Sequence, residues 1–193
     1  MKVRLNNRSE NVLKILRDVL TVISENDCHG MKTVGGTKIN NQEITKRLDL
    51  SSHLGFLPTC SELILQFEMP VAQNPVFGIR LSNALGEEYV IGFDASKNQF
   101  FSDRTRAGKT AFSEKFAATQ HIATRFSSDR RVEMHLIFDR ASCELLADNG
   151  SVAMTDLFFP NQDFSKMEIF SEQGAVQIKS GKVWKLSGPA VSR

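Results

Sequence analysis

The stretch from Phe138 to Pro160 constrains the fold most, because two apolar arms flank a tight turn. Asp148-Asn149-Gly150 has the composition of a β-hairpin turn, since Asn and Gly tolerate the positive φ angles of primed turns. The arms, 143–147 and 151–159, are rich in apolar residues and short enough for strands. Pro160 has no N–H to donate to a ladder, so it ends the second arm. The stretch predicts a hairpin within a sheet.

Further strand-like segments follow one another along most of the chain, separated by turn signals that contain Gly, Asn, Asp or Pro. The expected strands are 62–69, 76–82, 88–93, 98–102, 132–139, 166–171, 175–179 and 182–186, with turns that include Ser180-Gly181. Residues 105–118 are polar and then Phe-rich, and they predict a long loop. Short strands at this spacing are typical of an all-β, two-sheet antiparallel β-sandwich.

The first fifty residues carry weaker signals. Apolar residues between Asn11 and Ser24 recur at helical spacing, although the β-branched residues of 18–24 also suit a strand. We therefore expect a short helix that passes into a strand. Residues 28–42 predict a loop with at most one poor strand, and 43–50 alternates like a strand. The expected organisation is an N-terminal helix or linker segment, 1–24, and a single sandwich domain, 25–193.

Charge and composition exclude several classes of function. The formal net charge of +2 on 193 residues is too small to indicate nucleic acid or an anionic membrane surface. No apolar run approaches the roughly 20 residues of a membrane span, and no signal peptide is expected near Met1. Cys28, Cys60 and Cys143 lack the spacing of metal ligands, so we expect no metal site and no cofactor. We expect free thiols, with one disulfide pair as the alternative.

The sequence contains few groups suited to catalysis. Glu144 and Asp148 would share one strand face but lie roughly 13 Å apart along it, at about 3.3 Å per residue. That separation does not suit the paired carboxylates of glycosidases. A lone His135 on a strand predicts a half-buried structural histidine. Tyr89 and Trp184 could stack on a sugar ring, although single aromatic residues in strands usually lie in the core.

Two segments resemble the C-terminal β-sandwich of glycoside hydrolase family 32, which includes levanases, inulinases and invertases. In the first, Tyr89–Gly108, a strand ends in Asp103-Arg104 before a Ser/Gly-rich stretch. The second, His135–Pro160, is similar to the family phrase F-x-D-R-S-S-x-E-x-F-x-N-D-G, which ends in F-P. The matching residues there are Phe138, Asp139, Arg140, Ser142, Glu144, Gly150, Phe159 and Pro160, with Asp148-Asn149 where Asn-Asp is usual. The resemblance covers residues 62–186.

This resemblance implies a lectin-like jelly-roll sandwich without catalytic residues of its own. In the family, catalysis belongs to an N-terminal five-bladed propeller with the motifs W-M-N-D-P-N-G, R-D-P and E-C, and none of them occurs in this chain. The resemblance therefore implies a C-terminal module of a fructan-acting hydrolase, inactive alone, whose partner is the propeller of the parent enzyme. That parent is expected in the periplasm or outside the cell.

Two other roles remain open. The module could bind fructan or another carbohydrate by itself, as lectin-like folds do, through Tyr89 and Trp184 on an exposed face. It could instead hold subunits together. We interpret Asp103-Arg104 and Asp139-Arg140 as structural, because charged groups at strand ends satisfy turn amides and carbonyls through charge-assisted hydrogen bonds.

Overall fold

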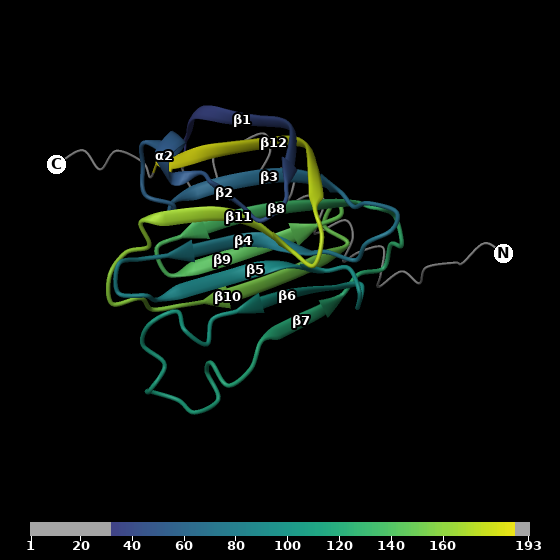
Figure 1. Cartoon of the computed structure of the whole chain (residues 1–193). Coiled ribbons are helices and arrows are strands. Elements are labelled where there is room, and N and C mark those ends of the chain that lie inside the picture. Colours follow the sequence, from purple (N-terminus) through teal and green to yellow (C-terminus); the bar gives the residue numbers. More distant parts are fainter. Residues whose placement is uncertain (1–31, 188–193) are drawn as a thin grey trace, which may run out of the picture. The chain divides into compact units, whose positions relative to one another are not determined.

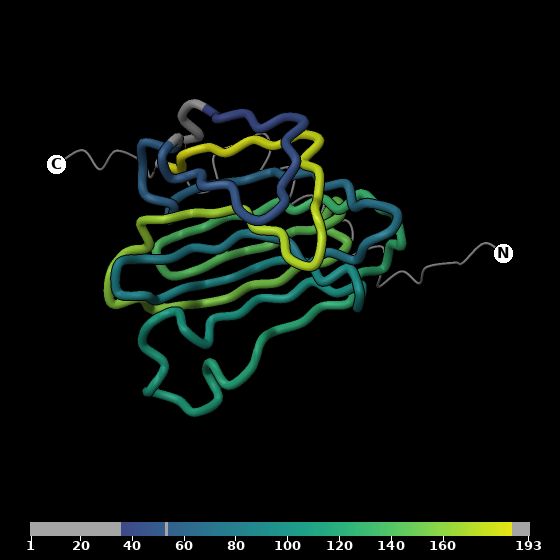
Figure 2. The backbone as a smooth tube through the Cα atoms, viewed as in Figure 1, coloured from purple at the N-terminus to yellow at the C-terminus, as the bar shows by residue number. Residues whose placement is uncertain are grey.

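Apart from one four-residue helix, the elements of residues 32–187 are strands, which form two antiparallel β-sheets (Figure 1). The computed structural model describes residues 32–187, and Figure 2 traces their path. The elements are β1 (Lys32–Ile44), β2 (Arg47–Asp49), α2 (Ser51–Leu54), β3 (Ser61–Glu68), β4 (Val76–Ser82), β5 (Glu88–Asp94), β6 (Gln99–Asp103), β7 (His121–Thr124), β8 (Arg131–Asp139), β9 (Ser142–Ala147), β10 (Val152–Leu157), β11 (Lys166–Glu172) and β12 (Val176–Ser187).

Residues 35–185 form one compact unit. One six-stranded sheet has the order β1-β12-β3-β8-β9-β10 and the other β2-β11-β4-β5-β6-β7. The sheets pack face to face: the centre of the Phe67 ring of β3 lies 4.8 Å from that of the Phe77 ring of β4. The predicted all-β, two-sheet sandwich is confirmed.

Alternation along each strand builds the core between the sheets. In β3 and β8 every second side chain is buried, and on this face all are apolar except Ser61 at the start of β3. Aromatic rings continue this layer, since Phe93 of β5 lies 5.7 Å from Phe77 and 5.0 Å from Phe100 of β6. Seven of the fourteen Phe residues are buried in this core.

The predicted hairpin is confirmed as β9 and β10, which pair from Ala147 with Val152 to Ser142 with Leu157. Its turn has positive φ at Asp148 (48°), Asn149 (57°) and Gly150 (77°). The strands expected from residue 62 to residue 171 occur within one or two residues of their predicted ends. The long loop predicted at 105–118 joins β6 to β7, and His121–Thr124 forms β7.

Three expectations were wrong. Residues 32–44 form strand β1, where 28–42 was expected to be mainly loop. At a sheet edge β1 needs only one partner, β12, so it forms without a regular apolar pattern. The strand expected at 43–50 is broken at Thr45-Lys46, because its two halves join different sheets.

The turn expected at Ser180-Gly181 is absent, because β12 runs through it with an irregularity between Ile178 and Ser180. Gly181 instead allows close packing: a Cβ there would lie 2.8 Å from Leu65 Cδ2. The helix expected between Asn11 and Ser24, and the boundary at residue 24, lie outside the described residues.

A glycine pair lets β4 and β5 approach closely. Gly78 and Gly92 are direct partners, and a Cβ on Gly78 would lie 2.1 Å from the carbonyl oxygen of Ile91. From the neighbouring strand β6, the ring of Phe101, the partner of Gly92, lies over Gly92 with Cζ 3.1 Å from the position a Cβ would take. This ring fills the space that the missing side chain leaves.

We expect Gly78→Ala to destabilise the fold by about 3 kcal/mol, because the backbone atoms that it would meet cannot rotate away. The matched control is Gly86→Ala in the β4–β5 turn, where no atom lies within 4 Å but φ is +77°. That change should cost about 1 kcal/mol through backbone strain alone. Urea denaturation measures both, and equal losses would contradict the steric explanation.

Candidate functional site

Most of the residues that match the family phrases lie at one end of the sandwich, which we call the signature corner (residues 103–118, 139–142 and 156–163). Glu144 and Gly150 lie further along the β9–β10 hairpin. Main-chain bonds join the three segments: Phe158 N donates to the oxygen of Ala141 (2.9 Å), and Lys109 N donates to the oxygen of Phe159 (2.8 Å). Arg104 Nη1 donates to the oxygen of Leu157 (3.1 Å). Motifs that are far apart in the sequence therefore form one structural unit.

A buried carboxylate, Asp156 of β10, lies beneath this corner with only 3% of its surface exposed. Its Oδ2 accepts hydrogen bonds from the hydroxyls of Tyr89 (3.1 Å) and Ser102. Its Oδ1 lies 2.6 Å from His121 Nδ1 and 3.7 Å from Arg104 Nη1. The partners come from β5, β7 and the end of β6, so this carboxylate connects the two sheets. Sequence reasoning missed Asp156, and the only available signal was an acid within an apolar arm.

The two aromatic residues considered for sugar stacking lie in different places. Tyr89 is 0% exposed, and burial raises the pKa of its hydroxyl well above the ordinary value. It has no surface to offer a sugar ring, so its structural place is the core. Trp184 is half-buried in β12, where its ring packs on Gly36 and lies 5.0 Å from Lys182 Nζ. The structure does not bring the two side chains together.

Asp103 and Arg104 end β6 with contacts inside the protein. Asp103 accepts hydrogen bonds from the amide (2.9 Å) and hydroxyl (2.6 Å) of Thr105, and from Gln120 Nε2 (2.9 Å). Burial alone would raise the pKa of Asp103, but these bonds outweigh it and the pKa lies below the ordinary value. The guanidinium of Arg104 also lies 4.1 Å from the centre of the Phe116 ring.

The second signature pair ends β8. Asp139 accepts a hydrogen bond from the amide of Arg140 (2.7 Å), and Cys60 Sγ lies 4.0 Å from its Oδ1. Burial, followed by the charge of Asp139, raises the pKa of the Cys60 thiol. Ser142 begins β9, and Glu144 is exposed in the middle of that strand. Gly150 lies in the turn at the far end of the hairpin, away from these residues.

An aromatic patch covers the outside of the corner. The rings of Phe112, Phe116 and Phe159 lie 4.6–5.7 Å apart, and Phe112 is 62% exposed. Beside them is a hollow of about 560 Å³ that Lys109, Arg140 and Asp163 also line. An exposed aromatic cluster with a charged rim is typical of a surface that contacts another macromolecule.

The corner is suited to binding and not to bond cleavage. Asp156 has no access to substrate, since its oxygens already face two hydroxyls, an imidazole and a guanidinium. Cys143 is fully buried, and burial raises the pKa of its thiol, which keeps it protonated and unreactive. Among residues 32–187, no group of three His, Cys, Asp or Glu side chains could hold a metal ion, and no helix could span a membrane.

Comparison with known proteins identifies the family. The family described as "Glycosyl hydrolases family 32 C terminal" matches residues 31–185. The chain belongs to this family. Among family 32 relatives, a levanase of Bacillus sp. (strain L7) is 30% identical over 126 residues, which are 65% of this chain and 14% of the levanase. A levanase of Bacillus subtilis is 23% identical over 163 residues, 80% of this chain and 24% of that protein.

Solved structures with this fold include exo-inulinase from Aspergillus awamori, with a TM-score of 0.60 at 21% identity over 82% of this chain and 29% of that one. Fructofuranosidase from Schwanniomyces occidentalis, complexed with fructose, gives 0.59 at 19% identity over 81% and 34%. The chain thus spans less than a quarter of the two levanases and about a third of these family 32 structures. The resemblance seen in the sequence is confirmed.

Replacing the buried carboxylate tests the corner. We expect Asp156→Ala to cost about 3–5 kcal/mol of unfolding free energy, because it leaves Arg104 and two hydroxyls buried without their partner. Tyr89→Phe removes one hydrogen bond and should cost about 1 kcal/mol. Chemical denaturation monitored by fluorescence measures both. A loss below about 1 kcal/mol for Asp156→Ala would show that the network does not hold the sheets together.

Glu87 gives the corner a pH dependence. It accepts hydrogen bonds from the side chains of Asn83 and Asn161 (2.6 Å each), which ties the β4–β5 turn to the segment after Pro160. Burial raises its pKa, but these bonds outweigh burial and leave the pKa below its ordinary value of 4.5. A lowered folded pKa stabilises the protein above the unfolded value, and this contribution is lost as pH falls through the folded value.

We therefore expect thermal stability to fall as the pH decreases below about 4.5, and to fall less steeply in Glu87→Gln. Melting temperatures at several pH values between 3 and 7 measure both slopes. Glu144→Gln, an exposed acid on β9, is the matched control and should retain the wild-type slope. Identical slopes for wild type and Glu87→Gln would contradict the assignment.

Proposed function

We propose that this chain is the non-catalytic C-terminal module of an extracellular, fructan-acting glycoside hydrolase, and that its signature corner packs against the catalytic propeller. Family membership supports this, as do the names of the relatives, which include levanases and extracellular exo-inulinases. Each relative is several times longer than the part that matches, which leaves room for a separate catalytic part.

The convergence of the signature residues at the corner carries this proposal. Asp103 and Arg104 support the base of the loop at 104–118, and Phe159 binds its middle through Lys109 N and Gly108. These internal contacts fix the loop so that its aromatic patch around Phe112 faces outward. The residues that match the family motifs therefore hold an aromatic patch at the surface. We infer that the C-terminal modules of the family use this surface for a common contact.

The physical role of this contact is to stabilise the catalytic part. Burying apolar surface contributes roughly 25 cal/mol per Å². Interfaces between domains of one chain commonly bury about 600–1,500 Å². Arg140 and Lys109 at the rim of the hollow would pair with carboxylates or carbonyls of the partner and fix its orientation.

The catalytic prediction concerns the purified chain. We expect it to release no fructose from levan, inulin or sucrose, because the motifs that carry catalysis in the family, W-M-N-D-P-N-G, R-D-P and E-C, do not occur in it. Chromatographic detection of free fructose measures this, with a family 32 levanase as the positive control. Fructose release that scales with the amount of chain would overturn the non-catalytic assignment.

The docking prediction concerns an enzyme in which the chain follows a family 32 catalytic part. Phe112→Asp should lower the melting temperature of the catalytic part by several degrees, because a charge would enter the apolar contact. Phe126→Asp is the matched control, since Phe126 is even more exposed (82%) but lies outside the corner. Equal effects of the two changes, or no effect of Phe112→Asp, would contradict docking through this corner.

A further inference from the structure

A second hollow lies at the other end of strand β8, where the chain enters it. This groove of about 770 Å³ is bordered by the β7–β8 loop, the β9–β10 turn and the adjoining ends of β3, β8 and β12. Strand β8 runs from Arg131, which lines the groove, to Asp139 at the signature corner. The groove is therefore separate from the surface proposed for docking.

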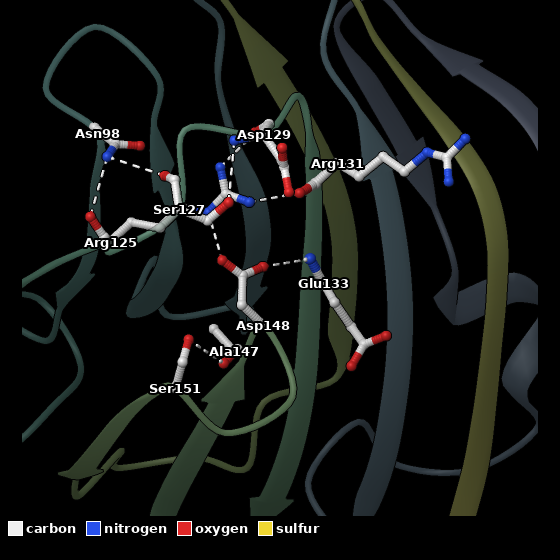
Figure 3. Close-up of polar contacts among 9 residues, drawn as sticks. All are labelled: Asn98, Arg125, Ser127, Asp129, Arg131, Glu133, Ala147, Asp148 and Ser151. Carbon is white, nitrogen blue, oxygen red and sulfur yellow. Dashed lines mark hydrogen bonds and ion pairs between the residues drawn. The ribbon is translucent and has the colours of Figure 1, made fainter. Parts of the chain in front are cut away.

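Arg125 fixes two borders of this groove to each other (Figure 3). Its side chain is 1% exposed, and Nε donates to Asp148 Oδ2 of the β9–β10 turn at 2.5 Å. Nη1 donates to the oxygen of Asp129 (2.6 Å) and Nη2 to that of Arg131 (2.5 Å), which holds the β7–β8 loop. Asp148 Oδ1 in turn accepts the amide of Glu133 (3.1 Å). A ligand would thus meet walls that are already ordered, which lowers the entropic cost of binding.

The charges that line the groove cancel. Three cationic side chains (Arg125, Arg131, Lys179) stand against three carboxylates (Asp129, Glu133, Asp148). A lining without net charge does not favour phosphates or polyanions, whereas it suits a neutral ligand with many hydroxyls. The side chains of Arg131 and Asn149 have no hydrogen-bond or ion-pair partner among residues 32–187, so they can serve a ligand's hydroxyl groups.

An aromatic ring stands beside these polar groups. Phe126 is 82% exposed, although the residue before it is held on all sides by hydrogen bonds. The side chain of Asn98 also donates to the backbone oxygens of Arg125 (3.0 Å) and Ser127 (3.2 Å), one on each side of Phe126. The ring is therefore presented to solvent from a rigid backbone. Such a ring next to polar side chains can stack on the apolar face of a sugar while they bind its hydroxyls.

We propose that this groove binds a neutral oligosaccharide, with Phe126 stacking on one sugar ring and Arg131 and Asn149 donating hydrogen bonds to hydroxyl groups. The sugar chemistry follows from the lining itself, whereas the choice of fructan as the first probe rests on the proposed function. The contact differs from the sugar-stacking pair considered in the sequence, because neither Tyr89 nor Trp184 lines the groove.

The test is titration of the whole purified chain with an inulin-type fructo-oligosaccharide, and separately with a malto-oligosaccharide, followed by amide NMR shifts and calorimetry. We expect saturable binding with a millimolar-range Kd and shifts at Ser127 and Asn149. Phe126→Ala should weaken binding at least about tenfold. Phe112→Ala, an exposed aromatic residue at the signature corner, is the matched control and should bind as wild type does.

Two results would overturn the proposal: no saturable binding of either sugar to the wild-type chain, or unchanged binding by a folded Phe126→Ala variant. Arg131→Ala provides a second check and should also weaken binding, because its guanidinium makes no hydrogen bond or ion pair among residues 32–187 and can donate to the ligand. Binding of the malto-oligosaccharide alone, lost in Phe126→Ala, would support the groove as a sugar site and count against fructan as the substrate of the proposed enzyme. These outcomes therefore distinguish a failure of the groove proposal from a failure of the proposed fructan-acting function.

Discussion

The arrangement at the signature corner depends on one buried carboxylate. Asp156 belongs to β10 of one sheet, and all of its partners come from the other sheet or from the residues that follow β6. A buried charge requires hydrogen-bond donors or cationic groups around it. Here two hydroxyls donate to Oδ2, and His121 Nδ1 and the Arg104 guanidinium lie beside Oδ1. That requirement fixes the position of β7 beside β6 and the direction in which the loop at 104–118 leaves the sheet. The same contacts therefore also set where the loop places the exposed patch around Phe112.

Local patterns were sufficient to predict much of the fold. The Asn-Gly turn and the alternation of β8 are properties of neighbouring residues, and the structure reproduces both. The strong strands each bury one face, so their periodicity records their environment directly. Strand β1 was not predicted, because it forms by pairing with β12, which lies far away in the sequence. The continuation of β12 through Gly181 was not predicted, because glycine is common both in turns and where strands pack closely.

The candidate sites were less accessible to sequence reasoning. Asp103 and Asp139 could be placed at strand ends and assigned structural contacts, because turn capping is local. Asp156 and Arg125 could not, since a polar side chain in a strand or loop does not reveal whether distant groups will pair with it. Tyr89 and Trp184 illustrate the same point, because both lie in strands but differ in burial. Tyr89 is fully buried and its hydroxyl donates to Asp156, whereas Trp184 is half-buried.

Strand β8 acts as a spacer of fixed length. Its nine residues run from the groove to the signature corner, roughly 26 Å at about 3.3 Å per residue. Because β8 is hydrogen-bonded on both sides, by β3 and β9, the sheet holds this distance. A polymer anchored in the groove would reach a catalytic part docked at the corner only through a stretch of several sugar units. The geometry would then favour long chains over short ones, a selection by length that requires no contact with the scissile bond.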